Sequence, residues 1–182
     1  RWGFDRHVQF LASRGYAVLQ PQFRGSTGYG HEFEKAGYGE WGKSIINDIN
    51  DSVQSLIEDG TIDDQRICIM GEGLGAYSAF HAAIGDKEIY KCMVSIEGFF
   101  DIKDFFYRDR HVVYERSNRE MWGSEREAKK LSPLKMVKEI DVPLLLIASE
   151  QNTSIDIRHS ADLYKKLKKN KKLVEFIKLD TE

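Results

Sequence analysis

The chain has 182 residues and a formal net charge of -2, with 41% hydrophobic and 31% charged residues. This length and balance predict one globular, soluble domain with a sizeable core and exclude an intrinsically disordered chain. The small net charge gives no overall electrostatic argument for a nucleic-acid or membrane-surface partner. No apolar run approaches 18 residues, so we expect no membrane-spanning segment.

The first third of the chain alternates helical and extended patterns. It predicts a helix over residues 4–14, a strand over 16–20, a glycine-rich loop over 23–42 and an amphipathic helix over 45–57. Loops as long as 23–42 usually carry function in compact domains. We therefore treat this loop as a candidate functional segment.

The remaining chain continues the alternation around one irregular segment, residues 99–134, which we expect to form helical excursions over one end of the sheet. Continuously apolar strands separated by helices predict a parallel sheet covered by helices on both faces, an α/β three-layer fold. The predicted strands are 66–70, 91–96, 143–148 and 172–179, and the predicted helices are 74–84 and 156–169.

The cysteines and histidines do not form a recognisable metal or redox motif. Cys68 and Cys92 lie inside apolar runs, so we expect buried free thiols, a reducing compartment and a cytoplasmic location. No C-x-x-C motif is present, and the five histidines lack i,i+4 spacing, so we expect no metal and no cofactor. The basic run at 165–172 is interpreted as a solvated helix end rather than a polyanion site.

Residues 67–77, "ICIMGEGLGAY", place three glycines at alternate positions between a predicted strand and a predicted helix. One interpretation is a nucleophile elbow, G-x-S-x-G, with Gly73 at the serine position. The other is a dinucleotide-binding turn, G-x-G-x-x-A, formed by Gly71, Gly73 and Ala76. In that case Glu97, at the end of the next strand, would bind a ribose hydroxyl.

Three motifs resemble the peptidase domain of the prolyl oligopeptidase family, whose fold is the α/β hydrolase. They are "RGYAVLQPQFRGSTGYG" (14–30), "DDQRICIMGEGLGAY" (63–77) and "LSPLKMVKEIDVPLLLIASEQNTSI" (131–155). The resemblance covers nearly the whole chain. It implies that residues 1–182 are a single peptidase-like domain, a fragment without the first strands and the C-terminal histidine segment.

The resemblance also implies that the catalytic apparatus is degenerate. Peptidases of this family use a serine, a histidine and an aspartate. Gly73 stands at the serine position, Leu74 at the neighbouring oxyanion-side position and Asn152 at the aspartate position. We therefore expect a pseudopeptidase. The alternatives are an active peptidase with a different arrangement of residues and the dinucleotide-binding module.

The resemblance suggests a substrate pocket beside the elbow, formed by Phe99, Phe100 and Tyr77. Ligands of α/β folds bind at the carboxyl ends of the strands, where these aromatic residues are expected. We expect a peptide or a small molecule as the ligand. The sequence leaves a homo-oligomer open.

Overall fold

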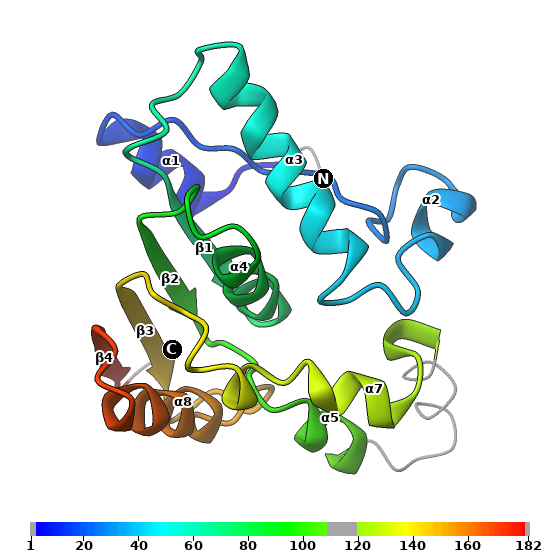
Figure 1. Cartoon of the computed structure of the whole chain (residues 1–182), viewed down its shortest axis with the longest axis vertical. Helices are drawn as coiled ribbons and strands as arrows, with labels where there is room; N and C mark the ends of the chain where they lie inside the picture. Colours follow the sequence, from blue (N-terminus) through cyan, green and yellow to red (C-terminus); the bar gives the residue numbers. More distant parts are fainter. Residues whose placement is uncertain (1–2, 109–119, 181–182) are drawn as a thin grey trace.

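The computed structural model describes residues 3–108 and 120–180. At its centre lies a parallel sheet with the order β1-β2-β3-β4 (Figure 1). The strands are β1 (Cys68–Glu72), β2 (Cys92–Ile96), β3 (Leu144–Ser149) and β4 (Val174–Leu179). These four strands match the predicted ones in order and differ from them by a few residues at the ends.

The helices follow the predicted order as well. Residues 99–134, predicted to be irregular with helical excursions, contain α5, α7 and the short 3₁₀ helix η1, while residues 109–119 of that segment lie outside the described residues. The helices of the described residues are α1 (Arg6–Ser13), α2 (His31–Lys35), α3 (Ser44–Glu58), α4 (Leu74–Gly85), α5 (Ile102–Arg108), α7 (Glu125–Lys130), η1 (Pro133–Lys135) and α8 (Arg158–Lys169).

The main core lies between one face of the sheet and helices α3, α4 and α8. Alternate strand residues such as Met93, Leu144 and Leu146 are buried and cluster with Phe80 of α4 and Leu163 of α8. The intervening residues on the strands point to the other face and are partly exposed. Burial of this apolar surface is the main stabilising contribution to the fold.

The sequence predicted helices on both faces of the sheet. Helix α1 does not form the second helical layer, because none of its residues is buried. The predicted strand 16–20 is also absent, because this segment has no strand partner among the described residues and is exposed along its length. Its side chains Tyr16 and Leu19 are 65% and 42% exposed. The β-branched and aromatic pattern of this segment was sufficient to predict an extended conformation, but a strand also needs a hydrogen-bonding neighbour.

The two cysteines form a disulfide between adjacent strands, which corrects the prediction of free thiols. Cys68 of β1 and Cys92 of β2 are register partners in the parallel pair, so their side chains leave the sheet on the same face at the same level. Disulfides persist mainly in oxidising compartments. The cysteines therefore no longer support the expected reducing, cytoplasmic location.

The glycine-rich loop is fixed to α3 near its start. The guanidinium of Arg24 donates to both carboxylate oxygens of Asp48, with distances of 2.6 and 2.7 Å, and this pairing holds the pKa of Asp48 below its usual value. The backbones of Gly25 and Gly37 also touch, because a Cβ added to Gly37 would lie 2.5 Å from the Cα of Gly25. Residues 26–36 therefore form a loop whose two ends lie next to each other.

Candidate functional site

The turn between β1 and α4 consists of Gly73 alone. Its φ of 55° and ψ of -117° lie outside the regions that residues with side chains favour. The Gly73 N–H donates to the carbonyl of Ile96 at 3.0 Å, and its carbonyl accepts from the Phe99 N–H at 3.2 Å. These bonds attach the turn to the end of β2. This is the sharp strand–turn–helix geometry of a nucleophile elbow.

Gly71 allows the strand to touch the first turn of α4. A Cβ at Gly71 would lie 2.2 Å from the carbonyl atoms of Gly75 and 2.5 Å from the nitrogen of Ala76. No side chain fits at that separation. Close packing and the elbow turn thus explain Gly71 and Gly73 without a dinucleotide ligand.

Asn152, at the expected aspartate position, caps a tight turn after β3. Its side-chain oxygen accepts hydrogen bonds from the backbone N–H groups of Ser154 and Ile155, at 2.8 and 3.0 Å. An amide carries no negative charge, so it would not stabilise an imidazolium as a carboxylate does. In this structure Asn152 organises the local backbone.

The Asn152 turn brings Ile155 to the elbow. A Cβ built on Gly73 would lie 3.3 Å from the Cδ1 of Ile155. Ile155 and Leu74 both pack against a smaller buried cluster, which consists of Tyr77, Phe99, Ile102, Trp122 and Ala128. The space beside the expected serine position is therefore bordered by an aliphatic side chain.

Glu97 lies directly after β2 with a φ of 49°, a costly conformation for a residue with a side chain. Its Oε1 accepts a hydrogen bond from the Ser149 N–H at 2.7 Å, so the carboxylate joins the ends of β2 and β3. Its Oε2 is buried and has no hydrogen-bond partner in the described part of the chain. The sequence identified Glu97 only as a possible ribose ligand and gave no sign of this bridge.

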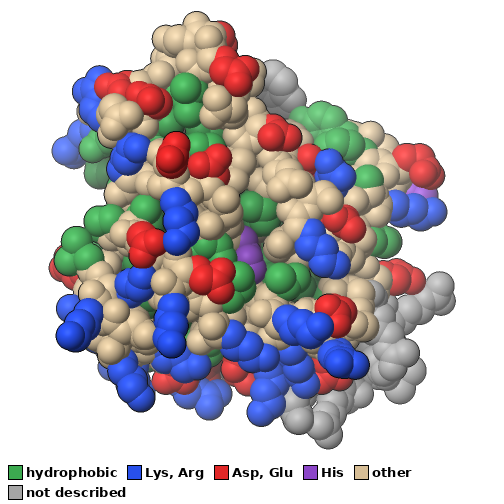
Figure 2. Space-filling model, viewed as in Figure 1, with side chains coloured by type: hydrophobic (Ala, Val, Ile, Leu, Met, Phe, Trp, Pro, Cys, Tyr) green, Lys and Arg blue, Asp and Glu red, His purple; other side chains and the backbone are tan. Residues whose placement is uncertain are grey.

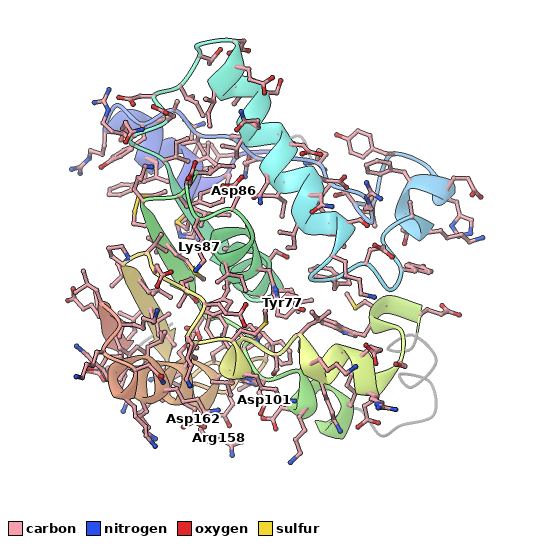
Figure 3. All side chains as sticks on the ribbon, in the orientation of Figure 1. Tyr77, Asp86, Lys87, Asp101, Arg158 and Asp162 are labelled. Carbon is pink, nitrogen blue, oxygen red and sulfur yellow. A yellow bond between two sulfur atoms is a disulfide. The ribbon has the colours of Figure 1, made fainter. Side chains whose placement is uncertain are left out.

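The three predicted pocket aromatics are buried. Tyr77 and Phe100 have no exposed surface, and Phe99 is 7% exposed. Figure 3 shows Tyr77 at the centre of the molecule, between α4 and the α5–α7 region, and its ring packs edge-on against Trp122. Phe99 is held at the elbow by its backbone N–H. A role for these three rings in a substrate pocket stays a prediction.

Two of the five histidines, His81 and His159, are buried, and each is 4% exposed. The His159 ring lies 4.6 Å from the Phe99 ring, and its Nδ1 accepts from the Asp101 N–H at 3.2 Å. His159 Nε2 lies 3.7 Å from the Asp104 carboxylate. His159 thus fastens α8 to the segment after β2. Only tertiary contacts reveal this role.

Residues 3–108 and 120–180 contain no cluster of three or more His, Cys, Asp or Glu side chains suited to hold a metal ion. Within the same residues, no helix has both the length and the apolar character needed to span a bilayer. His111 lies outside the described residues.

Comparison with known proteins identifies the family. The model of the prolyl oligopeptidase family matches residues 2–181. An uncharacterized peptidase of Bacillus subtilis, YuxL, is 31% identical over 188 residues, covering 95% of this chain and 27% of that protein. The dipeptidyl aminopeptidase BIII of Pseudoxanthomonas mexicana is 38% identical over 97 residues, covering 53% of this chain and 14% of that protein.

Solved structures agree on the fold. An acylaminoacyl peptidase of Pyrococcus horikoshii superposes with a TM-score of 0.85 at 24% identity, covering 98% of this chain and 30% of that one. An acylaminoacyl peptidase in complex with Z-Gly-Gly-Phe-chloromethyl ketone gives a TM-score of 0.77 at 25% identity, covering 88% of this chain and 26% of that one. The fold is therefore of the α/β-hydrolase type, and the chain belongs to the prolyl oligopeptidase family.

Proposed function

We propose that this domain is a pseudopeptidase, which binds a peptide at the elbow without cleaving it by serine chemistry. The observation that carries the proposal is that Gly73 keeps the elbow geometry but has no side chain that could attack a carbonyl. Loss of the nucleophile in a serine hydrolase lowers turnover on the order of a millionfold.

The surroundings of Gly73 support the same proposal. The Asn152 oxygen already accepts two backbone hydrogen bonds, so the expected acid position serves a turn. The Ile155 side chain borders the space that a nucleophile would use. Gly73, Asn152 and Ile155 occupy separate positions of the site. Because all three disfavour catalysis, a binding role explains the site better than the loss of a single catalytic residue.

A peptide is the proposed ligand class. One structurally similar acylaminoacyl peptidase was solved with the peptide reagent Z-Gly-Gly-Phe-chloromethyl ketone. In this chain the Phe99 N–H bonds to the elbow, and two residues before it the buried Oε2 of Glu97 has no hydrogen-bond partner among the described residues. An acceptor of this kind gains most from a hydrogen bond supplied by a ligand, since an unsatisfied buried polar atom is costly.

The catalytic half of the proposal is tested by labelling with a fluorophosphonate probe, followed by intact-mass measurement, beside an active acylaminoacyl peptidase as the positive control. We expect full labelling of the control and no adduct on this protein. A stoichiometric adduct on any serine of the glycine-rich loop or of α4 would overturn the proposal in favour of an active enzyme with a different arrangement.

The binding half is tested by calorimetric titration with Z-Gly-Gly-Phe amide, which lacks the reactive group. Wild-type protein and the variant Gly75→Leu should bind it, because a Cβ at Gly75 meets nothing within 4 Å. Gly73→Leu should lose binding, because its side chain would fill the elbow. Equal affinity of both variants would show that the peptide binds elsewhere.

A further inference from the structure

A hollow lies on the helical side of the sheet, between the start of α3, the end of α4 and the η1 region. It has a volume of about 390 Å³. Figure 2 shows a histidine side chain near the centre of this face, with hydrophobic side chains on both sides. Among the residues that line the hollow, His81 is the buried polar group, and Ile46, Ile84, Leu131 and Met136 supply the apolar walls.

The His81 ring offers a defined hydrogen-bond acceptor. Its Nε2 lies 2.8 Å from the carbonyl oxygen of Leu131, and a carbonyl only accepts, so Nε2 carries the proton. Burial lowers the pKa of His81 to about 4, so the ring is neutral near pH 7. The unprotonated Nδ1 is therefore an acceptor, and it forms no hydrogen bond with the described residues.

The other polar groups of the hollow do not favour an anion. The Lys43 ammonium donates to the Gly39 carbonyl at 2.9 Å, and the Ser44 hydroxyl donates to Glu40. Glu139 adds a carboxylate to the lining. Asn47 adds a neutral amide. Lys43 and Glu139 contribute one positive and one negative charge, so the lining carries no net charge, and the hollow favours a neutral ligand that donates a hydrogen bond and has an apolar body.

We propose that this hollow binds a small, neutral aromatic heterocycle whose N–H group donates a hydrogen bond to Nδ1 of His81. The apolar walls would cover the two faces of the ring system. His81 lies seven residues after Leu74 on α4, about 10 Å along the helix from the elbow. The site is thus separate from the elbow, and the proposal does not depend on whether the elbow is catalytic.

The probe pair that tests this is indole and 1-methylindole, which share a shape but differ in the N–H group. Ligand titrations followed by NMR chemical shifts of the protein should show tighter binding of indole, by about two- to tenfold, the value of one neutral hydrogen bond. The largest shifts should map to residues around His81. Equal affinity for the two probes, no binding, or shifts centred on Gly73 would each overturn the proposal.

Variants separate the hydrogen bond from the cavity. His81→Gln keeps a donor for Leu131 and an acceptor for the ligand, so the preference for indole should persist, whereas His81→Leu should abolish the preference. Ile84→Trp should fill the hollow and prevent binding of both probes, while Ile62→Trp, another half-buried isoleucine outside the hollow, should not. Unchanged indole binding in Ile84→Trp would refute the site even if His81→Leu does not fold.

Discussion

The Glu97 carboxylate accepts a hydrogen bond from the backbone N–H of Ser149, which joins the ends of β2 and β3 beside the elbow. Ser149 is 1% exposed, so without Glu97 its N–H would be buried and unpaired. We expect Glu97→Ala to lower the free energy of unfolding by about 1–3 kcal/mol. Glu97→Gln, which keeps an acceptor oxygen, should lose less. Denaturant midpoints of the two variants check this, and equal losses would contradict it.

Gly73→Ser tests the elbow. The new side chain would adopt a disfavoured backbone conformation at φ 55° and approach Ile155, so we expect a loss of about 1–3 kcal/mol in unfolding free energy. Gly75→Ser is the matched control in α4 and should change stability little or raise it slightly. Urea denaturation of the three proteins measures both effects.

We also expect Gly73→Ser to show no turnover of an aminoacyl ester, because Asn152 remains at the acid position and its oxygen is engaged. An unchanged or raised stability would show that the turn is not strained for a residue with a side chain. Ester turnover above the wild-type background would mean that the remaining residues suffice for catalysis.

We expect loss of the hydroxyl group to affect stability differently at Tyr77 and at Tyr90. The Tyr77 hydroxyl is buried and has no hydrogen-bond partner among the described residues, and burial raises the pKa of Tyr77 above its usual value. The Tyr90 hydroxyl donates to Asn50 Oδ1 at 2.8 Å. Tyr77→Phe should therefore leave stability unchanged or raise it, while Tyr90→Phe should lose about 1 kcal/mol. Thermal unfolding of both variants measures these effects. A larger loss of stability in Tyr77→Phe than in Tyr90→Phe would contradict the described packing.

The Cys68–Cys92 disulfide closes a sequence separation of 24 residues. Loop-closure entropy predicts a stabilisation of about 3 kcal/mol. We expect a reducing agent to lower the denaturant midpoint of the wild-type protein but not that of the double variant Cys68→Ala/Cys92→Ala. Thiol-specific alkylation with mass measurement gives an independent check, since two labelled cysteines in the untreated protein would show that the bond does not form.

His81 predicts a specific acid sensitivity. Its pKa is lowered in the folded protein, from 6.5 to about 4, so the unfolded chain binds more protons between these values. The corresponding stability is fully present above about pH 6.5 and is lost as the pH falls toward 4, on the order of 3 kcal/mol in total. As the pH is lowered from 7 to 4, the denaturant midpoint of the wild-type protein should fall more steeply than that of His81→Gln. Parallel profiles would exclude this role for His81.

The regular elements were predictable because their patterns are local. Alternating burial places Met93 and Leu146 in the core, and the helical spacing of Ile45, Ile49 and Val53 marks the buried side of α3. Motif spacing alone also predicted a sharp turn at Gly73, and Gly73 is the residue between β1 and α4.

The remaining features depend on contacts between distant segments. Cys68 and Cys92 are brought together by the register of β1 and β2. The residues next to each cysteine in the sequence do not show whether it forms a disulfide. Ile155 reaches the elbow only through the turn that Asn152 caps, and His159 meets Asp101 across 58 positions of sequence. The pattern of residues along the sequence does not predict these contacts.

The contact between Gly25 and Gly37 makes the glycine-rich loop a closed module. Within it, the residues that flank 26–36 meet backbone to backbone, and the Arg24–Asp48 ion pair fixes that junction to α3. The residues between them can change in length or composition without moving the points where the loop joins the scaffold. We therefore expect residues 26–36 to tolerate an inserted epitope, whereas a side chain at either glycine would push the junction apart.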